Sequence, residues 1–386
     1  MNSPSTQSRD FLSEITMTAQ ISSARAERLF GVLSQGTSSS CLITDLSDIR
    51  WLTGFSGSHA WLVIHANKLS LITDGRYTEQ ARAEIDVHQA NVDVIECRTQ
   101  AAMIATTKSL SQGASEIQFQ DSDMSHQLFC LLQTELNAAL VPLDASGKFL
   151  RRFKDETEIK IIESACRIAD QALTQCRGLL SQGLCEGDVR DELDYAMRKL
   201  GADGPSYDTI VASGPINAAR PHHHPTTTKI EDGHTVIIDV GALVAGYHSD
   251  MTRSFVIGPM SVEQSEWYEA VRASQQAGIA VCRPGIQASE VDAACRKVLI
   301  EAGLDQYFTH GTGHGVGLMI HEEPFINSSA TAILQPGDVV TVEPGLYRGG
   351  FGGFRVEDLV VITEHGCRIL NTSPKDPICP PLQLTT

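Results

Sequence analysis

Apolar residues along the chain follow two spacings, one typical of strands and one typical of helices. The segments "CLITDL", "AWLVIH" and "KLSLITD" are rich in β-branched and alternating apolar residues, as short strands are. The segments "ISSARAERLFGVLSQ" and "SHQLFCLLQTELNAAL" instead repeat apolar residues at helical spacing. Helix-like and strand-like segments alternate in this way over residues 21–150, which predicts a small α/β domain.

The pattern also predicts where the domains begin and end. The opening stretch "MNSPSTQSRDFLSEIT" is polar and unpatterned, so residues 1–20 are expected to be a disordered extension, with Met17 as an alternative start. A charged junction, "RRFKDETE", precedes a long amphipathic helix and places a boundary near residue 150. A second domain is expected over residues 151–375, followed by a tail over 376–386.

The second domain contains an internal repeat. The stretch "LLSQGLCEGDVRDELDYAMRKLGADG" parallels "VCRPGIQASEVDAACRKVLIEAGLDQ", and "KIEDGHTVIIDVG" parallels "ILQPGDVVTVEPG". The second pair places Asp239 and Glu343 at equivalent positions, at an offset of 104 residues. Repeats of this kind predict two similar structural units. We therefore expect two helix-plus-hairpin halves related by a pseudo-twofold axis, with an acidic residue from each half near that axis.

Composition narrows the class of partner. The 47 acidic residues outnumber the 30 lysines and arginines, for a formal net charge of −17, which disfavours nucleic acid and anionic membranes as partners. The ten cysteines form no C-x-x-C pair, which is typical of a reducing compartment. The sequence has no signal-peptide-like start and no uncharged apolar run of membrane-spanning length. These features predict a cytoplasmic protein.

The first hairpin of the repeat brings two aspartates together. In "TVIIDVGALVAGYHSDMTRSFVIG", a turn at Val244 and Ala245 would place Asp239 directly opposite Asp250. Taken alone, an aspartate beside glycine at a strand end is usually part of a turn. What favours a binding site is the combination of this hairpin with a histidine–glycine segment and with the Glu-Pro-Gly and Arg-x-Glu motifs of the repeat-related hairpin.

The second hairpin supplies two more carboxylates. The strands "DVVTVEPG" and "FRVEDLVVI" flank the glycine-rich "RGGFGG" and bring Glu343 towards Glu357, in a register that a bulge would alter. Four carboxylates this close raise one another's pKa unless cations neutralise them, so the set predicts two divalent metal ions. Oxygen ligands with one histidine favour Mn²⁺, Co²⁺ or Fe²⁺ over a Cys/His-type structural zinc.

Histidines lie in two further segments, "PHHHP" and "HGTGHGVGLMIHEEP". The first is typical of a solvated loop when it is considered alone. The second places His310, His314 and His321 among glycines, whose missing Cβ atoms allow the backbone to approach a metal or substrate closely. Together with the two acidic hairpins, this segment predicts a catalytic metal site.

These motifs resemble the metallopeptidase family with the pita-bread fold, M24, and within it the Xaa-Pro aminopeptidase and prolidase branch. The similarity covers residues 40–375 and is carried by "IIDVG", "YHSDMTRSF", "HGTGHGVGLMIHEEP", "VEPGLY" and "FRVED". The segments "WLTGFSGS" and "TDGRYTEQA" resemble the creatinase-type amino-terminal domain, which methionine aminopeptidases lack. The resemblance implies an α/β (α+β) fold: a small creatinase-like domain followed by a pita-bread catalytic domain.

The resemblance also implies roles for individual residues. The expected metal ligands are Asp239, Asp250, His314, Glu343 and Glu357, and the expected ions are two Mn²⁺, with Co²⁺, Fe²⁺ or Zn²⁺ as alternatives. Glu343 is expected to take a proton from the attacking water and pass it to the leaving nitrogen. His222, His310 and His321 are expected to contact the substrate or stabilise the intermediate. Tyr347 and Arg355 are expected to line the pocket.

The leading interpretation is an Xaa-Pro aminopeptidase that acts on peptides with proline in the second position. The alternatives are a prolidase restricted to dipeptides, a creatinase-like hydrolase of a non-peptide C–N bond, and a non-catalytic binding protein. The complete ligand set argues against the last two. The resemblance further implies a homodimer, in which Trp51, Phe55 and His59 are candidates for contact with the partner's active site.

Overall fold

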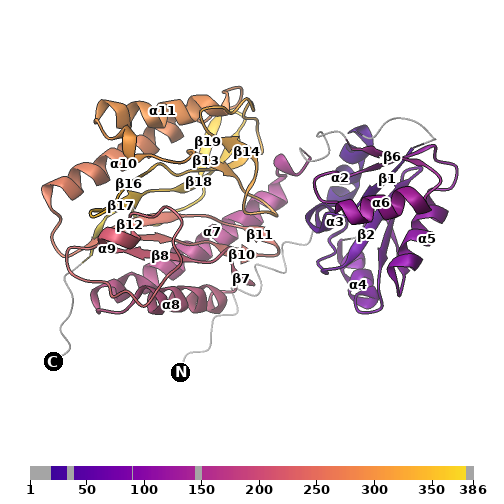
Figure 1. Ribbon diagram of the computed structural model, residues 1–386, viewed down its shortest axis with the longest axis horizontal. Coiled ribbons are helices and arrows are strands. Elements are labelled where there is room, and N and C mark those ends of the chain that lie inside the picture. The colour runs from indigo at the N-terminus through magenta and orange to yellow at the C-terminus, as the bar shows by residue number, and fades with distance from the viewer. Residues whose placement is uncertain (1–18, 33–38, 89, 144–149, 380–386) are drawn as a thin grey trace. The chain divides into compact units, whose positions relative to one another are not determined.

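A computed structural model describes residues 19–32, 39–88, 90–143 and 150–379 (Figure 1). The described chain divides into two compact units, one ending at Arg151 and the other beginning at Arg152. The expected extension before residue 19, the alternative start at Met17 and residues 380–386 lie outside the described residues.

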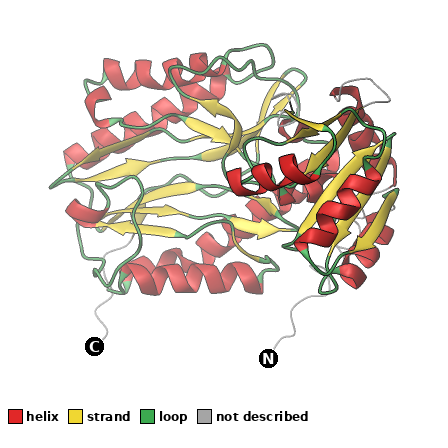
Figure 2. Cartoon of the chain, turned by 45° about the vertical axis from the view of Figure 1, so that its right-hand side comes forward, coloured by secondary structure: helices red, strands yellow, loops and turns green. Residues whose placement is uncertain are grey.

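The first unit is a six-stranded mixed sheet with helices packed against it (Figure 2). The strand order is β4-β3-β2-β1-β5-β6, with β2 antiparallel to both of its neighbours. The strands are β1 (Ser39–Ile43), β2 (Ala60–His65), β3 (Lys68–Thr73), β4 (Val92–Glu96), β5 (Glu116–Phe119) and β6 (Ala139–Pro142). The helices are α2 (Ala19–Val32), α3 (Leu46–Thr53), α4 (Thr78–His88), α5 (Gln100–Leu110) and α6 (His126–Glu135). The three strands predicted from the sequence are β1, β2 and β3.

Two of the aromatic residues considered for a dimer contact belong to the core of this unit. Trp51 lies on α3, and Phe55 follows the Gly54 that ends this helix. Their exposed fractions are 2% and 1%, so neither side chain is available to a partner. His59 is the one of the three whose side chain is partly exposed, at 44%.

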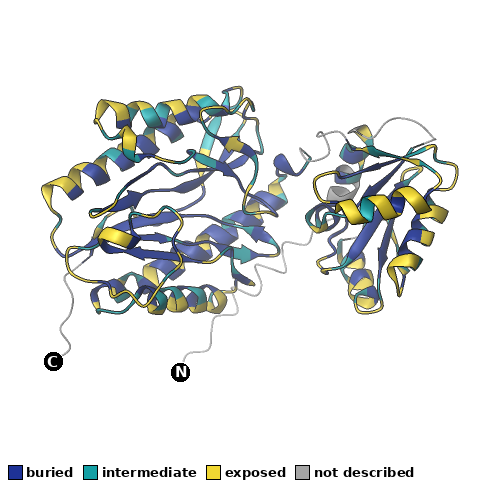
Figure 3. Ribbon diagram, in the orientation of Figure 1, coloured by how far each residue is buried: buried dark blue, intermediate teal, exposed yellow. Residues whose placement is uncertain are grey.

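The second unit places its strands between two pairs of helices, with α7 and α8 on one side and α10 and α11 on the other (Figure 1). Strand residues in this middle layer are mostly buried, whereas the outer faces of the helices are exposed (Figure 3). The helices are α7 (Glu156–Cys176), α8 (Glu186–Lys199), α9 (Gly214–Asn217), α10 (Val262–Val281) and α11 (Ala288–Glu301), with short 3₁₀ segments at η3 (Arg177–Ser181) and η4 (Asp305–Tyr307). A third 3₁₀ segment, η2 (Leu150–Arg152), contains the boundary between the two units.

The strands of this unit form two main sheets and two small ones. The four-stranded sheet contains β8 (Ile210–Ser213), β9 (Thr235–Asp239), β12 (Thr252–Ile257) and β20 (Ile378–Cys379). The five-stranded sheet contains β13 (Gly313–Gly315), β14 (Glu322–Ile326), β15 (Val339–Val342), β18 (Asp358–Thr363) and β19 (Gly366–Ile369). One small sheet contains β7 (Gly204–Pro205), β10 (Ala242–Val244) and β11 (Tyr247–His248). The other contains β16 (Gly345–Arg348) and β17 (Gly352–Arg355).

The two halves of the repeat have the same construction. In the first, α8 is followed by the antiparallel pair β9 and β12, and in the second, α11 is followed by the antiparallel pair β15 and β18. This arrangement, with the small α/β unit before it, confirms the predicted fold class. Because β20 pairs with β12, the folded unit extends to Cys379, beyond the expected end at residue 375.

The register of the first hairpin differs from the sequence prediction. Asp239 lies opposite Thr252, not opposite Asp250, so the predicted pairing was wrong. The reason is the turn, which falls at Ala245 and Gly246, with φ angles of 47° and 79°. A two-residue turn with positive φ at both positions suits right-twisted strands and favours glycine at the second position. Asp250 lies two residues before Thr252.

The second hairpin keeps one register throughout. The β15–β18 pairing ends at Val342 and Asp358, and β16 and β17 continue with the same register beyond them. Glu343 and Glu357 are the next residues on the two strands and therefore lie opposite each other.

Among the described residues, no helix is long and apolar enough to cross a membrane.

Candidate active site and metal centre

A cavity of about 590 Å³ opens in the second unit where the two hairpins meet. All five expected metal ligands line it, together with His222, His310, His321 and Arg355. The other lining residues are Tyr207, Asp208, Ile210, Pro221, His224, Gly311, Gly313, Ile320, Phe325, Ile326 and Asn327. Residues far apart in the sequence thus meet at one concave surface, as expected for a binding or catalytic site.

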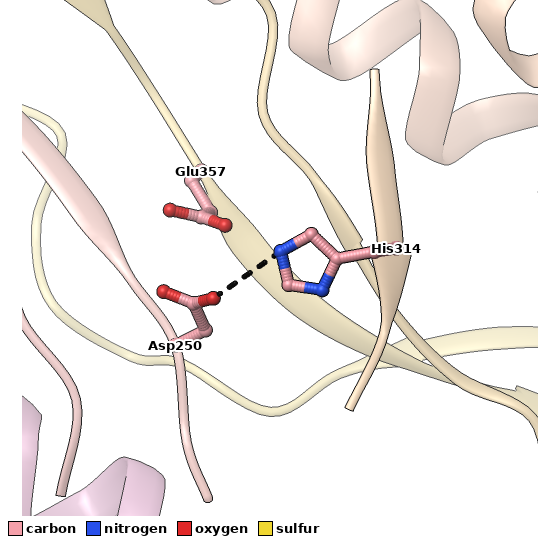
Figure 4. Close-up of side chains that lie close together, drawn as sticks. All are labelled: Asp250, His314 and Glu357. Carbon is pink, nitrogen blue, oxygen red and sulfur yellow. Dashed lines mark ion pairs between the residues drawn. The ribbon is translucent and has the colours of Figure 1, made fainter. Parts of the chain in front are cut away.

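Three of the expected ligands form a compact cluster (Figure 4). Asp250, His314 and Glu357 each offer a ligand atom, and these atoms lie within 4.8 Å of one another. The His314 Nε2 atom is 3.6 Å from Asp250 Oδ2. The three side chains come from three different segments and point towards a common centre, which is the arrangement that metal coordination requires.

The remaining two expected ligands border this cluster. Glu343 Oε1 lies 3.5 Å from the same Nε2 atom of His314. Asp239 Oδ2 accepts a 2.6 Å hydrogen bond from Arg355 Nη2. The structure therefore brings all five residues to the same cavity, but Asp239 is partly engaged by a buried guanidinium.

The orientation of His314 suits a metal ligand. Its Nδ1 lies 3.1 Å from the carbonyl oxygen of Gly315. A carbonyl oxygen only accepts hydrogen bonds, so Nδ1 carries the proton and the lone pair of Nε2 faces the carboxylates. Burial lowers the pKa of His314 to about 4, which keeps the ring neutral. A neutral ring held by its other nitrogen is the form that binds metal ions.

The electrostatics of the carboxylates also fit divalent cations. Burial raises the pKa of Glu343 to about 8, and the neighbouring Asp239 adds to the rise while Arg355 opposes it. Burial, followed by repulsion from the other carboxylates, raises the pKa values of Asp250 and Glu357 well above their usual range. Four acidic groups, of which Asp250 and Glu357 are buried and Asp239 and Glu343 are half-buried, are compensated by one arginine. Their excess negative charge is one that two divalent ions would neutralise.

Two residues that the sequence analysis missed support the ligands. The Tyr207 hydroxyl contacts both Asp239 Oδ1 and Asp250 Oδ1. The Thr252 hydroxyl donates a 2.7 Å hydrogen bond to Glu357 Oε2. Tyr207 lies in none of the motifs quoted above, whereas Thr252 lies in "YHSDMTRSF" but was assigned no role there. The observed register places Thr252 opposite Asp239, but the turn assumed in the sequence analysis gave a different register and so did not point to it.

Arg355, Tyr347 and His310 form a chain of hydrogen bonds beside the cavity. Arg355 Nη1 donates to the Tyr347 hydroxyl at 2.9 Å, which in turn lies 3.0 Å from His310 Nε2. His310 Nδ1 lies 2.7 Å from the carbonyl of Gly311, so Nδ1 donates and Nε2 accepts. Burial lowers the pKa of His310 to about 4. Both ring nitrogens of His310 are thus engaged within the protein, and Tyr347 is not among the described residues that line the cavity.

The other cavity histidines have different surroundings. The rings of His222 and His224 pack edge to face, with centroids 5.5 Å apart. The ring of His321 lies 4.4 Å from that of His314 and belongs to an exposed residue. His224, for which the sequence predicted no role, therefore shares the cavity with the two histidines that were expected there.

The fold and the site together define a metal-dependent hydrolase built from a duplicated helix-and-hairpin unit. Residues 160–364 match Metallopeptidase family M24, and residues 25–152 match the creatinase/prolidase N-terminal domain. The chain belongs to the M24 metallopeptidase family.

Some of the solved structures similar to this chain are named dipeptidases or prolidases, and others are named aminopeptidases. The Xaa-Pro dipeptidase from Bacillus anthracis superposes with a TM-score of 0.87 at 32% identity, covering 92% of this chain and 99% of that one. The prolidase from Pyrococcus horikoshii OT3 gives 0.86 at 30% identity, with 92% and 100% covered. The X-Pro aminopeptidase from Thermotoga maritima MSB8 gives 0.84 at 32% identity, with 92% and 99% covered.

Proposed function

We propose that this protein is an Xaa-Pro dipeptidase, a prolidase that hydrolyses the bond between an amino-acid residue and a carboxy-terminal proline. The observation that carries the peptidase assignment is the convergence of Asp250, His314 and Glu357 in one cavity that Asp239 and Glu343 also line. The dipeptidase specificity is supported by the prolidases among its structural relatives. It replaces the aminopeptidase that the sequence analysis placed first.

We propose that the five cavity residues hold two divalent ions, with Mn²⁺ as the first choice because the ligands are mainly carboxylate oxygens. Bound divalent ions polarise a carbonyl oxygen and lower the pKa of water. Asp250, His314 and Glu357 supply the most compact group of ligand atoms. His314 enters this group with its Nε2 lone pair already directed at the carboxylates.

Glu343 is the proposed proton carrier. Its carboxylate accepts the proton that the attacking water loses as oxygen adds to the scissile carbonyl carbon. It then gives this proton to the proline nitrogen as the carbon–nitrogen bond breaks. Thr341 Oγ1 donates a 3.3 Å hydrogen bond to Glu343 Oε1, which orients the carboxyl group. A carboxyl group that accepts a proton in one step and returns it in the next acts first as general base and then as general acid.

The oxyanion that forms on the substrate needs hydrogen-bond donors. His222 and His321 line the cavity and are the proposed donors. His310 is not, because its Nδ1 proton is given to Gly311 and its Nε2 accepts from Tyr347. We assign His310, Tyr347 and Arg355 to one hydrogen-bonded chain that holds Asp239.

An Xaa-Pro aminopeptidase is the second candidate, favoured by the similarity to the Thermotoga maritima enzyme. The two functions differ in the group attached to the proline carbonyl, which is a free carboxylate oxygen in a dipeptide and a further residue in a longer peptide. A homodimer stays a prediction, supported by the family resemblance. A cytoplasmic location also stays a prediction, supported by the free thiols of all ten cysteines.

The proposed function is tested with a hydrolysis panel on metal-stripped protein reconstituted with Mn²⁺. The panel compares an Xaa-Pro dipeptide, its carboxy-terminal amide, an Xaa-Pro-Yaa tripeptide and a longer Xaa-Pro peptide. Glu343→Gln removes the proton carrier, and Glu364→Gln is the matched control, because Glu364 is exposed. Cleavage of the dipeptide alone, lost in Glu343→Gln and kept in Glu364→Gln, is the expected result. Cleavage of the longer peptides identifies an aminopeptidase, and no cleavage of any peptide rejects both functions.

A further inference from the structure

The segment "PHHHPT" (residues 221–226) directs its three histidines to two sides. His222 and His224 line the cavity, whereas His223 is 4% exposed and does not. This is the alternation expected of extended backbone, where successive side chains point in opposite directions. His223 Nε2 lies 2.9 Å from Glu186 Oε2, and both side chains are buried. The segment therefore makes a buried contact through His223 on one side and presents the imidazoles of His222 and His224 on the other.

Glu186 holds this segment through several bonds. It is the first residue of α8 and is fully buried. Its Oε2 atom accepts from His223 and from both the backbone nitrogen and the hydroxyl of Thr226, at 3.0 and 2.8 Å. Its Oε1 atom accepts from Ser213 N at 2.7 Å and Asn217 Nδ2 at 3.0 Å. One carboxylate thus connects the histidine segment to α8, β8 and α9.

The other end of the segment is fixed by the active site itself. The carbonyl oxygen of Pro221 accepts a 3.0 Å hydrogen bond from Arg355 Nη1, and the same guanidinium binds Asp239. The segment is therefore held at Pro221 from the metal-ligand side and at His223 and Thr226 from the α8 side. The backbone between these anchors carries His222 and His224.

Glu186 and His223 are not among the described residues that line the cavity, so a bound peptide would not touch them. We propose that Glu186 and His223 are positioning residues, whose buried hydrogen bond holds the imidazoles of His222 and His224 towards the substrate. The inference rests on the proposed peptidase function. His224 thereby joins His222 as a second imidazole donor to the substrate's carbonyl or carboxylate oxygens.

The first test compares two substitutions at His223 in the full-length protein loaded with Mn²⁺. His223→Leu removes the nitrogen that binds Glu186, whereas His223→Gln keeps a donor nitrogen at a similar reach. We expect His223→Leu to lower kcat/KM for an Xaa-Pro dipeptide roughly tenfold, and His223→Gln to stay within about threefold of the unaltered protein. His65→Leu is the matched control, because His65 also makes a side-chain hydrogen bond, to Ser40, but lies in the other unit.

The second test asks whether the effect passes through the cavity histidines. In a background with His222→Ala and His224→Ala, His223→Leu should change kcat/KM by less than about twofold, because the groups it positions are gone. An equal loss in both backgrounds would mean a general structural role and would overturn the inference. If His223→Leu does not fold, Thr226→Val is used in the same cycle, because it removes one bond to Glu186. Thr226→Val should then lower kcat/KM by less than His223→Leu would, and this loss should again nearly disappear in the background that lacks both cavity histidines.

A measurement that does not depend on catalysis tests this inference separately from the proposed function. In protein with ¹³C-labelled histidine, the ring Cε1–H signals of His222 and His224 are assigned from the two alanine variants. His223→Leu should shift and broaden both signals in metal-stripped protein, and His223→Gln should preserve them. Unchanged signals in His223→Leu would overturn the inference. A protein that cleaves no Xaa-Pro peptide but shows these shifts would reject only the proposed function.

Discussion

Thr252 and Glu357 join the two hairpins of the repeat through one buried hydrogen bond. The Thr252 hydroxyl donates to Glu357 Oε2 at 2.7 Å and accepts from Arg355 Nε at 3.0 Å. Thr252 lies on β12 of the first half, whereas Glu357 and Arg355 belong to the second. The hydroxyl therefore fixes a proposed ligand of one half against a strand of the other.

Thr252→Val should weaken metal binding more than its small change in shape suggests. The substitution leaves a buried carboxylate and a buried guanidinium nitrogen each short of one partner. Loss of a group that orients a ligand lowers metal affinity by about 10- to 100-fold. Calorimetric titration of Mn²⁺ into metal-stripped protein measures the effect. Thr252→Ser keeps the hydroxyl and is expected to bind nearly as tightly as the unaltered protein, and equal losses in both variants would contradict the explanation.

Metal removal should make stability depend on pH. The pKa of Glu343 is raised from 4.5 to about 8 in the folded chain. Between these values the folded protein keeps a proton that the unfolded chain releases, so the free energy of unfolding falls as pH rises. The slope for one such group is at most about 1.4 kcal/mol per pH unit. Bound metal ions compensate the charge and should remove this contribution.

The measurement is the unfolding midpoint at a series of pH values, with a chelator and with Mn²⁺. The chelated protein should lose stability from about pH 4.5 to pH 8, and the difference from the Mn²⁺ form should widen with pH. Glu343→Gln should show a shallower dependence when chelated. Parallel curves for the two forms of the unaltered protein would show that the carboxylates are not the groups responsible.

Tyr207→Phe should destabilise the site, because this hydroxyl contacts the carboxylates of Asp239 and Asp250 together. Burial is the main reason that the Tyr207 pKa lies well above its usual range, so the group stays protonated and can donate. Hydrogen bonds to charged groups contribute about 1.5–3 kcal/mol, and a loss of this size is expected in urea unfolding of metal-stripped protein. Tyr195→Phe is the control, because Tyr195 is 60% exposed. A loss no larger than that of the control would show that the two aspartates do not depend on this donor.

The sequence predicted the parts of the site that rest on local pattern. The repeat placed Asp239 and Glu343 at equivalent strand ends, and both line the cavity. The position of Asp250 was predicted from an assumed turn, and the turn moved by one residue because Gly246 takes positive φ more easily than Val244 would. Asp250 still reaches the cavity, because a shift by two residues along a strand preserves the face.

The remaining contacts depend on tertiary packing that no local pattern encodes. Tyr207 reaches the aspartates from a segment before β8, and the burial of His223 depends on Glu186, which lies 37 residues earlier in the sequence. The same holds for His310, whose ring nitrogens are engaged by Gly311 and Tyr347. The motif that contains His310 indicates a catalytic segment but not which of its imidazoles is free.

The packing behind Glu343 gives a last prediction. Gly278 lies in the middle of the contact between α10, α11 and β15, and a Cβ atom there would overlap Cys295 Sγ and lie 2.9 Å from Val342 Cγ1. Replacing a helical glycine with alanine is otherwise favourable by about 1 kcal/mol. Overpacking of a well-packed core costs about 1–3 kcal/mol, so the overlap should outweigh this gain and Gly278→Ala should lower the unfolding midpoint.

Because Val342 directly precedes Glu343, the same substitution should also lower kcat/KM by displacing the end of β15. Adding Cys295→Ala removes the sulfur that the new methyl group would overlap, so the double variant should recover part of the lost stability. Thermal unfolding and dipeptide hydrolysis of the two single variants and the double variant measure both effects. If Gly278→Ala were as stable as the unaltered protein, α10 would have to move away from β15 at little cost, and the helix layer would not determine the position of Glu343.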